Sequence, residues 1–336
     1  MRNGKILIGQ IGIGHNHAAA KMEAFRSLDT LFEVAGVVAE SQEWLKKRGG
    51  LPAYRDIPFM TEEALLNMPG LDAVAVETDV WDMLATARRC AVRGLHIHLD
   101  KPAGTDLAEY RMLLDSVKTQ NLAFQLGYMY RYNPAVRYCI EAVKRGELGE
   151  IFSVDAMMST EHSPEYRTWL NHFPGGTMYI FGCHLIDLIL QIQGPPEEVV
   201  PFLQRTGFNS VDAYDSTLAV FRYSKGASLV RVSSVEVNGW GRRQLVICGE
   251  KGTLEMKPME RPTLLTRSYA GGDAYNDVRE VIMNRNFHDK LGRYDDQLRD
   301  FAAFILEKKE NPYSPDYEWT LQKILLEACA FGKGQE

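Results

Sequence analysis

The chain is predicted to be an α/β protein with two domains. An N-terminal doubly wound parallel sheet is expected over residues 1–124, and an α/β domain with a large, mainly antiparallel sheet over residues 125–336. Apolar runs alternate with helical patterns up to about Gln125, which is typical of a parallel sheet built from βα units. From Ile151 onward, polar and apolar residues alternate between turn residues, as in antiparallel sheets. A length of 336 residues also exceeds the usual span of one core.

The first element is an apolar run, 5–11, that leads into a turn containing Gly12 and Gly14. A helix over 18–25 is expected to follow. Such a turn lets backbone N–H groups approach a pyrophosphate, and the helix dipole favours its charge. Two glycines also occur in such turns for steric reasons alone, so the context has to decide.

A second buried strand, 32–39, is predicted to end at Glu40. An acid in this position hydrogen-bonds a ribose diol in dinucleotide folds. A carboxylate would repel the extra phosphate of NADP, so NAD is the expected cofactor and NADP the less favoured one. The alternative is an ordinary solvated acid at a strand end.

The remaining elements of the first domain continue the alternation. The predicted strands are 71–76, 95–99 and 123–126, and the predicted helices are 83–93 and 107–118. Ligands of a doubly wound sheet bind at the carboxyl ends of its strands.

The second domain is predicted to hold strands at 151–157, 216–223, 227–235, 243–248 and 252–257. Its predicted helices are 134–145, 182–193 and 294–307.

Composition excludes several classes of protein. An apolar fraction of 45%, a charged fraction of 24% and a net charge of −6 describe a soluble globular protein without a polyanionic partner. No basic cluster with interleaved aromatics indicates nucleic-acid binding, and no apolar stretch is long enough to span a membrane. The five cysteines are scattered and lack zinc spacing, so we expect reduced thiols in a cytoplasmic protein.

Four segments together resemble the glucose–fructose oxidoreductase, inositol dehydrogenase and MocA family of NAD(P)-dependent oxidoreductases. They are Gly9–His17, Asp100–Lys101–Pro102, Gly127–Pro134 and Gly175–Asp187. The resemblance implies a Rossmann domain, followed by a domain whose open-faced sheet commonly forms an oligomer interface. A homodimer or homotetramer is therefore expected. It also implies cofactor contacts from the turn residues His15, Asn16 and His17, and from Thr78, Asp100 and Lys101 at strand ends.

Hydride transfer from a carbinol requires a group that takes up the hydroxyl proton near neutral pH, and histidine suits this task. By resemblance, His184 is that base, and Lys101 polarises the reacting oxygen. The alternatives are a buried core histidine and a surface lysine.

The chain departs from the family pattern at several positions. The family aspartate four residues before the histidine is Ile180 here, so His184 lacks its usual partner. Asp187, three residues after His184, could reach it. His17 replaces the third glycine of the turn, and Asp100 replaces a glutamate.

His15 and His17 occupy alternate positions in a loop and could converge on one ion. Because the sequence offers no third ligand nearby, no metal site is expected. A capping or phosphate-binding role is favoured instead.

Substrate selection is assigned to the second domain and the loops over the nicotinamide. The stretch 159–169 is dense in hydrogen-bonding and aromatic groups, as a sugar or cyclitol requires. The alternative is a solvated loop with incidental charge. The predicted substrate residues are Tyr128, Arg131, His162, Arg167, Trp169 and Asp187.

The primary hypothesis is an NAD(P)-dependent oxidoreductase that transfers a hydride between nicotinamide and a hydroxyl carbon of a sugar, polyol or cyclitol. One alternative retains NAD and uses transient oxidation for glycoside cleavage or elimination. Another is a non-catalytic NAD-binding regulator.

Overall fold

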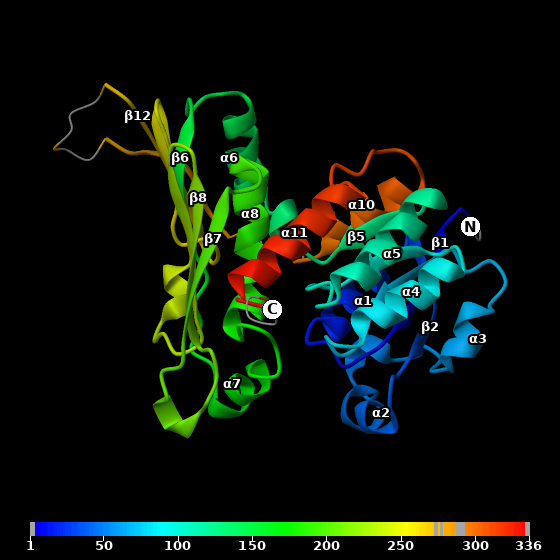
Figure 1. The fold of residues 1–336 in the computed structure, drawn as a ribbon. Helices are drawn as coiled ribbons and strands as arrows, with labels where there is room; N and C mark the ends of the chain where they lie inside the picture. Colours follow the sequence, from blue (N-terminus) through cyan, green and yellow to red (C-terminus); the bar gives the residue numbers. More distant parts are fainter. Residues whose placement is uncertain (1–3, 272–274, 276–277, 287–292, 333–336) are drawn as a thin grey trace. The chain divides into compact units, whose positions relative to one another are not determined.

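The computed structural model describes residues 4–271, 275, 278–286 and 293–332. The chain divides into two compact units (Figure 1). Unit 1 comprises Met1–Met129 and Leu291–Gln322, and unit 2 comprises Tyr130–Lys290 and Lys323–Glu336. The domain boundary that the sequence places after residue 124 stays a prediction; the compact first unit also takes in a segment from near the C-terminus.

Unit 1 contains a parallel sheet in the order β2-β1-β3-β4-β5. Its strands are β1 (Ile6–Ile11), β2 (Phe32–Val38), β3 (Ala73–Val76), β4 (His96–Leu99) and β5 (Phe124–Leu126). All side chains of β1 and β3 are buried, as expected for central strands covered on both faces. The predicted parallel sheet is therefore confirmed.

A single bridge between Val37 and Phe59 adds one more parallel contact outside β2. Counting it as a minimal strand gives the order 3-2-1-4-5-6 of dinucleotide-binding sheets. The first strands are added on one side of β1 and the later ones on its other side, so the order of addition reverses next to β1. Ligands of such sheets bind at this switch point, next to the turn that follows β1.

The helices of unit 1 are α1 (Ala18–Ser27), α2 (Gln42–Arg48), α3 (Glu62–Leu66), α4 (Met83–Val92), α5 (Leu107–Thr119) and α10 (Asp295–Ile305), with a 3₁₀ turn, η1 (Pro52–Tyr54). Helix α11 (Pro315–Ala328) contributes to both units. Several helices begin at side-chain caps: Ser41, Thr61 and Asp106 each accept a hydrogen bond from the backbone N–H three residues ahead.

Unit 2 contains an eight-stranded sheet in the order β13-β12-β11-β10-β6-β9-β8-β7. The strands are β6 (Ile151–Met157), β7 (Glu198–Gln204), β8 (Ser216–Tyr223), β9 (Gly226–Ser233), β10 (Gln244–Gly249), β11 (Gly252–Met256), β12 (Thr263–Tyr269) and β13 (Glu280–Arg285). Every pairing is antiparallel except that of β6 with β9. The predicted mainly antiparallel sheet is confirmed.

The helices of unit 2 are α6 (Pro134–Lys144), α7 (Pro164–Leu170) and α8 (Cys183–Gln193). Shorter turns are η2 (Met129–Tyr132), the π-helical η3 (Met178–Gly182), η4 (Phe208–Ser210) and η5 (Gly239–Arg242). Figure 1 shows α6 and α8 together on one face of the eight-stranded sheet.

Burial alternates along the strands of this sheet, so its two faces differ. In β8, Thr217, Ala219 and Phe221 are buried, whereas Leu218 and Val220 are only partly buried. The partly buried face is apolar in part, as the open face of a sheet would be.

None of the helices in the described ranges is both long and apolar enough to cross a membrane.

Candidate functional site

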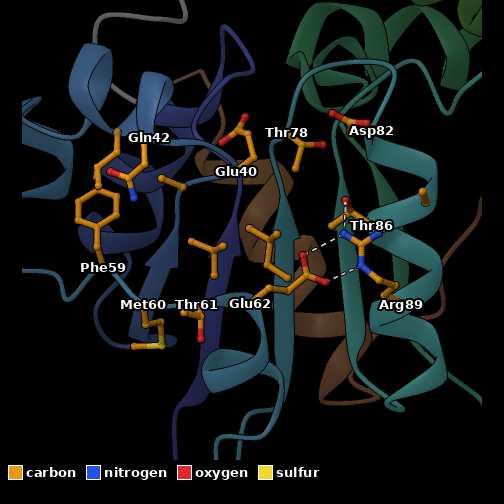
Figure 2. A pocket seen from close by; sticks show the side chains of 15 residues that line it. Glu40, Gln42, Phe59, Met60, Thr61, Glu62, Thr78, Asp82, Thr86 and Arg89 are labelled. Atoms are coloured by element: carbon orange, nitrogen blue, oxygen red, sulfur yellow. Dashed lines mark hydrogen bonds and ion pairs between the residues drawn. The ribbon is translucent and has the colours of Figure 1, made fainter.

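A cavity of about 670 Å³ lies in unit 1 at the carboxyl ends of its strands (Figure 2). Its lining includes Ile11, which ends β1, and Val38, which ends β2. Glu40 and Thr78, both predicted from sequence to contact a cofactor, also line it. The cavity therefore coincides with the switch point of the sheet, where dinucleotides bind.

The turn after β1 approaches the end of β3 closely. Gly12 has a φ of +97°, and a Cβ placed there would lie 2.3 Å from the backbone nitrogen of Thr78. Only glycine fits this position, both because of its backbone conformation and because of the close approach.

Replacing Gly12 by alanine is expected to destabilise unit 1 and to weaken cofactor binding at least about tenfold, because the turn must move away from Thr78. Gly70 is the matched control: it also has a positive φ, +79°, but a Cβ placed there would have no atom within 4 Å. Gly70→Ala should lose about 1 kcal/mol from backbone strain alone and retain cofactor affinity. Urea unfolding and NAD fluorescence titration measure both effects. Equal losses in the two variants would contradict the assigned close packing.

The side chain of Glu40 is hydrogen-bonded to the backbone of the glycine turn. Its Oε2 accepts a hydrogen bond from the Ile13 N–H at 2.8 Å, and its Oε1 accepts one from the Gly14 N–H at 2.7 Å. These backbone donors are of the kind that bind phosphate at helix N-termini. The carboxylate thus already satisfies two donors of the predicted phosphate-binding turn.

Helix α2 holds the other side of the turn. The Arg48 guanidinium donates to the carbonyl oxygens of Ile13, Gly14 and His15 at 3.0, 2.9 and 2.7 Å. It also donates to Oδ1 of the exposed Asn16 at 3.1 Å. The sequence did not point to Arg48, because a cation within a short helix beyond a strand end has no motif of its own.

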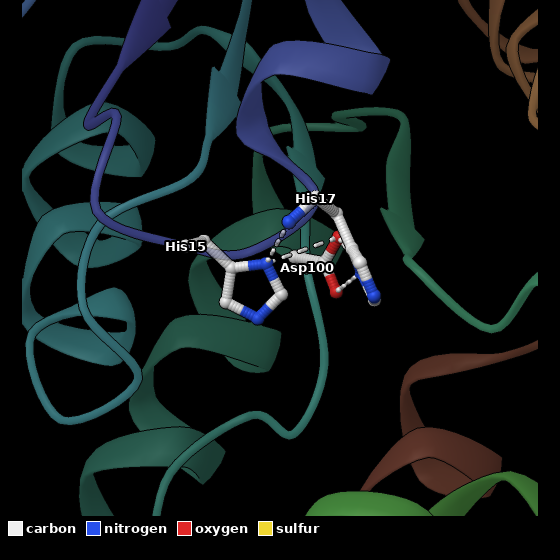
Figure 3. Close-up of side chains that lie close together, drawn as sticks. All are labelled: His15, His17 and Asp100. Atoms are coloured by element: carbon white, nitrogen blue, oxygen red, sulfur yellow. Dashed lines mark hydrogen bonds and ion pairs between the residues drawn. The ribbon is translucent and has the colours of Figure 1, made fainter. Parts of the chain in front are cut away.

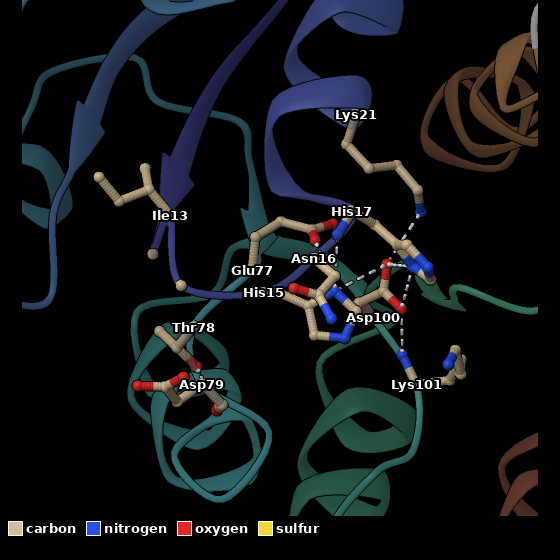
Figure 4. Close-up of polar contacts among 12 residues, drawn as sticks. Ile13, His15, Asn16, His17, Lys21, Glu77, Thr78, Asp79, Asp100 and Lys101 are labelled. Atoms are coloured by element: carbon tan, nitrogen blue, oxygen red, sulfur yellow. Dashed lines mark hydrogen bonds and ion pairs between the residues drawn. The ribbon is translucent and has the colours of Figure 1, made fainter. Parts of the chain in front are cut away.

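A buried polar cluster surrounds Asp100 at the carboxyl end of β4 (Figure 4). His17 Nδ1 lies 3.2 and 3.1 Å from the two carboxylate oxygens. His15 Nδ1 lies 3.7 Å from Oδ2, and Lys21 Nζ lies 3.5 Å from the same oxygen. The predicted cofactor residues His15, His17 and Asp100 are therefore brought together.

Burial and charge set the protonation states of this cluster. Burial lowers the pKa of His17 to about 3, although the Asp100 charge raises it. Burial alone would raise the pKa of Asp100, but the neighbouring His15, His17 and Lys21 hold it well below its usual range. Burial, followed by the charge of Asp100, raises the pKa of Glu77. Asp100 is therefore the ionised centre of the cluster.

Lys21 extends the cluster toward β5. Its ammonium donates to His98 Nε2 at 2.5 Å, and His98 Nδ1 lies 2.9 Å from Gln125 Oε1. Burial, together with Lys21, lowers the pKa of His98 well below 6.5, so the ring is neutral. The sequence did not predict a role for Lys21, because a lysine in an amphipathic helix is usually solvated.

Lys101 follows Asp100 directly and is 3% exposed. Its backbone N–H donates to Asp100 Oδ1 at 2.7 Å. A buried amine at the carboxyl end of a strand is consistent with a site residue rather than with a surface lysine.

His184 lies in unit 2 near the start of α8 and is 2% exposed. Its ring packs edge-on against Tyr130, with 5.6 Å between ring centroids. Ile180, which replaces the family aspartate, belongs to the π-helical turn η3 and is buried. A π turn shifts the side-chain register by one residue, so a spacing of four no longer identifies the residue one turn below.

A carboxylate that the sequence did not single out is linked to His184 through Tyr130. The Tyr130 hydroxyl donates a hydrogen bond to Glu260, and Arg243 donates to the same Oε1 at 3.1 Å. Glu260 is 1% exposed. Tyr130 therefore connects the His184 ring to a buried acid.

Five of the six predicted substrate residues form buried ion pairs in unit 2 or belong to its aromatic cluster. Arg131 binds Asp187 through two nitrogens, the shortest distance being 2.8 Å, and Arg167 binds Asp215 at 3.0 Å. His162 stacks against both Tyr166 and Phe181, with ring centroids 4.4 and 5.2 Å away.

The environment of His162 also changes its charge. Burial, helped by the charge of Arg243, lowers the pKa of His162 to about 4. Trp169 lies 5.2 Å from Tyr166 and joins this aromatic group. Tyr128, the remaining predicted substrate residue, is fully buried in unit 1. Substrate contact by these residues stays a prediction.

Comparison with known proteins shows similarity to one family of oxidoreductases. Residues 136–255 match a family model described as the GFO/IDH/MocA C-terminal domain. Myo-inositol 2-dehydrogenase of Thermotoga maritima is 24% identical over 320 residues, covering 92% of this chain and 88% of that protein. The chain is therefore similar to members of the Gfo/Idh/MocA family, and the family model matches it over residues 136–255.

A second relative and one solved structure extend the comparison. D-xylose 1-dehydrogenase (NADP⁺) 2 of Haloferax volcanii is 29% identical over 175 residues, and the match spans 51% of this chain and 52% of that protein. The solved structure of a levoglucosan dehydrogenase in complex with NADH and levoglucosan has a TM-score of 0.78 at 17% identity, covering 97% of both chains. The Gfo/Idh/MocA fold is thus shared over nearly the whole length.

Proposed function

We propose that the protein is an NAD-dependent dehydrogenase that acts on a CH–OH group of a sugar, polyol or cyclitol. The observation that carries this proposal is the cavity at the switch point of the unit 1 sheet, lined by Glu40 and Thr78 beside the Gly12 turn. The substrate class is supported by the relatives, which are named as dehydrogenases of inositol, xylose and levoglucosan.

The residues of unit 1 fit a nicotinamide dinucleotide. A Cβ at Gly12 would fill the close approach between the turn and Thr78, so the turn keeps this space free of side chains. Glu40 reaches the same turn and lines the same cavity, where a ribose diol requires an acceptor. When bound, the nicotinamide supplies the hydride acceptor or donor.

Lys101 and His184 are assigned separate roles. Lys101, held at the end of β4 next to the ionised Asp100, orients and polarises the substrate oxygen through its ammonium. His184 is proposed to accept the hydroxyl proton on a ring nitrogen. The contact of its ring with Tyr130, and of Tyr130 with Glu260, provides an acid in unit 2 where the family aspartate is absent.

A second candidate is an enzyme that retains NAD and cleaves or eliminates without net oxidation. It is favoured by one observation, the buried Ile180 in place of the family aspartate. Cytoplasmic location and assembly into a homodimer or homotetramer stay predictions.

Glu40 is expected to set the preference for NAD over NADP, because its charge faces the position of the extra phosphate. Glu40→Ala should lower the ratio of NAD to NADP affinity at least about tenfold. Release of the Ile13 and Gly14 amides affects both cofactors alike and cancels in the ratio. Glu62→Ala is the matched control, since Glu62 lines the same cavity but is paired with Arg89 at 2.5 Å.

Fluorescence titration with both cofactors measures this ratio. If Glu40→Ala and Glu62→Ala have the same ratio of NAD to NADP affinity, Glu40 does not determine the choice of cofactor.

A further inference from the structure

We propose that His15, His17 and Asp100 form a binding site for a divalent transition-metal ion, with Zn²⁺ as the test ion. The three side chains come from the turn after β1 and from the end of β4 (Figure 3). Each offers one ligand atom, and these atoms lie within 4.8 Å of one another. Two imidazoles and a carboxylate are a donor set that Zn²⁺ and neighbouring divalent metals prefer.

The spacing of the ligand atoms fits one ion. His17 Nδ1 lies 3.1 Å and His15 Nδ1 lies 3.7 Å from Asp100 Oδ2. In a tetrahedral site with bonds of about 2.1 Å, neighbouring ligand atoms are about 3.4 Å apart. Small side-chain rotations therefore suffice to bring the three atoms onto one ion.

Glu77 lies next to His15 and adds a negative charge beside the three ligands. Its Oε2 lies 3.5 Å from His15 Nδ1, and its side chain is fully buried. Neither carboxylate oxygen of Glu77 has a hydrogen-bond partner within the described part of the chain. A buried acid without such a partner is unfavourable unless a cation or a proton satisfies it.

The surroundings of His15 point to a cation in the same place. The backbone N–H of His17 donates a long hydrogen bond of 3.3 Å to His15 Nδ1, which identifies this nitrogen as the unprotonated one, and a bound ion would replace the N–H at its single lone pair. Carboxylate oxygens of Glu77 and Asp100 face the same nitrogen at 3.5 and 3.7 Å. The ring nitrogen and the two carboxylate oxygens repel one another because each carries a lone pair or a negative charge. A cation bound among them would be attracted to all three.

The net charge of the cluster is compatible with one divalent ion. Lys21 compensates Asp100 at 3.5 Å, whereas Glu77 has only the His15 ring at salt-bridge distance among the described residues. His17 is 25% exposed at its side chain, which provides an entry path. On binding, the proton on Nδ1 of neutral His17 moves to Nε2, so the ring stays neutral and coordinates through Nδ1.

The test is a titration of EDTA-treated, cofactor-free full-length protein with Zn²⁺ against a chromophoric chelator, under reducing conditions. One equivalent should bind, excess Mg²⁺ should not displace it, and Co²⁺ should give the intense visible bands of a tetrahedral site. Thermal unfolding should shift upward with Zn²⁺. Because cofactor is absent, the result is independent of the proposed dehydrogenase activity.

Variants locate the bound ion. His17→Gln and Glu77→Gln should each weaken Zn²⁺ binding, His17→Gln by at least about a hundredfold. His172→Gln, which changes an exposed histidine of unit 2, should leave binding unchanged. Lys21→Met should tighten binding, because it removes a like charge next to Asp100; this gain cannot arise from misfolding.

Absence of stoichiometric Zn²⁺ binding by the wild-type protein would overturn the proposal. Binding of equal strength in the wild type, His17→Gln and Glu77→Gln would overturn it as well, because the ion would then lie elsewhere.

Discussion

Lys101→Met is expected to lower kcat by about a thousandfold while changing NAD affinity by less than about threefold. Lys101 is 3% exposed, and its backbone N–H donates to the ionised Asp100, so the residue is buried and fixed at the end of β4. Methionine matches its length and removes only the charge and the donor. The loss should therefore appear in turnover rather than in cofactor binding.

Two controls separate this effect from a loss of structure. Circular dichroism and NAD titration of Lys101→Met report on the fold of unit 1. Lys118→Met changes an exposed lysine of α5 in the same unit and should retain full turnover. A Lys101→Met enzyme that keeps more than a tenth of wild-type kcat would contradict the assigned role.

Asp187→Asn is expected to destabilise unit 2 by about 3–5 kcal/mol, because it leaves the Arg131 charge buried without its carboxylate. The side chains of Arg131 and Asp187 are 0% and 1% exposed. Gln191 also donates to Asp187 Oδ2 at 2.9 Å, so its amide loses the charged acceptor too.

The double variant Arg131→Met/Asp187→Leu distinguishes a structural from a substrate role. Removing both charges should restore much of the lost stability. Urea unfolding followed by circular dichroism compares the variants. Glu150→Gln breaks an exposed pair with Lys225 at 2.7 Å and should leave the urea midpoint unchanged.

A stable double variant with wild-type turnover would assign the pair to structure, whereas a stable but inactive one would support the predicted contact with substrate. An Asp187→Asn variant as stable as the wild type would contradict the buried ion pair.

Much of the fold follows from periodicity. The βα alternation predicted the parallel sheet, and the change of pattern at Ile151 predicted the mainly antiparallel one. The contact between Val37 and Phe59, by contrast, is a single bridge, too short to leave a pattern in sequence.

The buried cluster at the candidate site was only partly predictable. His15 and His17 are close in sequence, but Asp100 lies 83 residues from His17, and only the fold brings it to the turn. A metal site was not expected because the sequence offers no third ligand near His15 and His17. In the folded chain, Asp100 lies close enough to be that ligand. Lys21 and Glu77 were missed because buried charges on ordinary elements carry no motif.

The π turn explains why the partner of His184 was hard to predict. Spacing rules assume α-helical register, and η3 breaks that register between Ile180 and His184. Glu260, which Tyr130 connects to the His184 ring, follows β11 far along the chain and could be found only from the fold.

Net hydride transfer from a CH–OH group to NAD is the reaction that distinguishes the proposed dehydrogenase from the alternative enzyme. The most direct measurement incubates the cofactor-free protein with NAD⁺ and a panel of sugars, polyols, cyclitols and their glycosides. Absorbance at the NADH band and chromatography of the products are followed together. We expect NADH in equimolar amount with an oxidised product. Glycoside cleavage or elimination without accumulation of NADH would contradict the proposed dehydrogenase activity and would establish the NAD-retaining reaction instead.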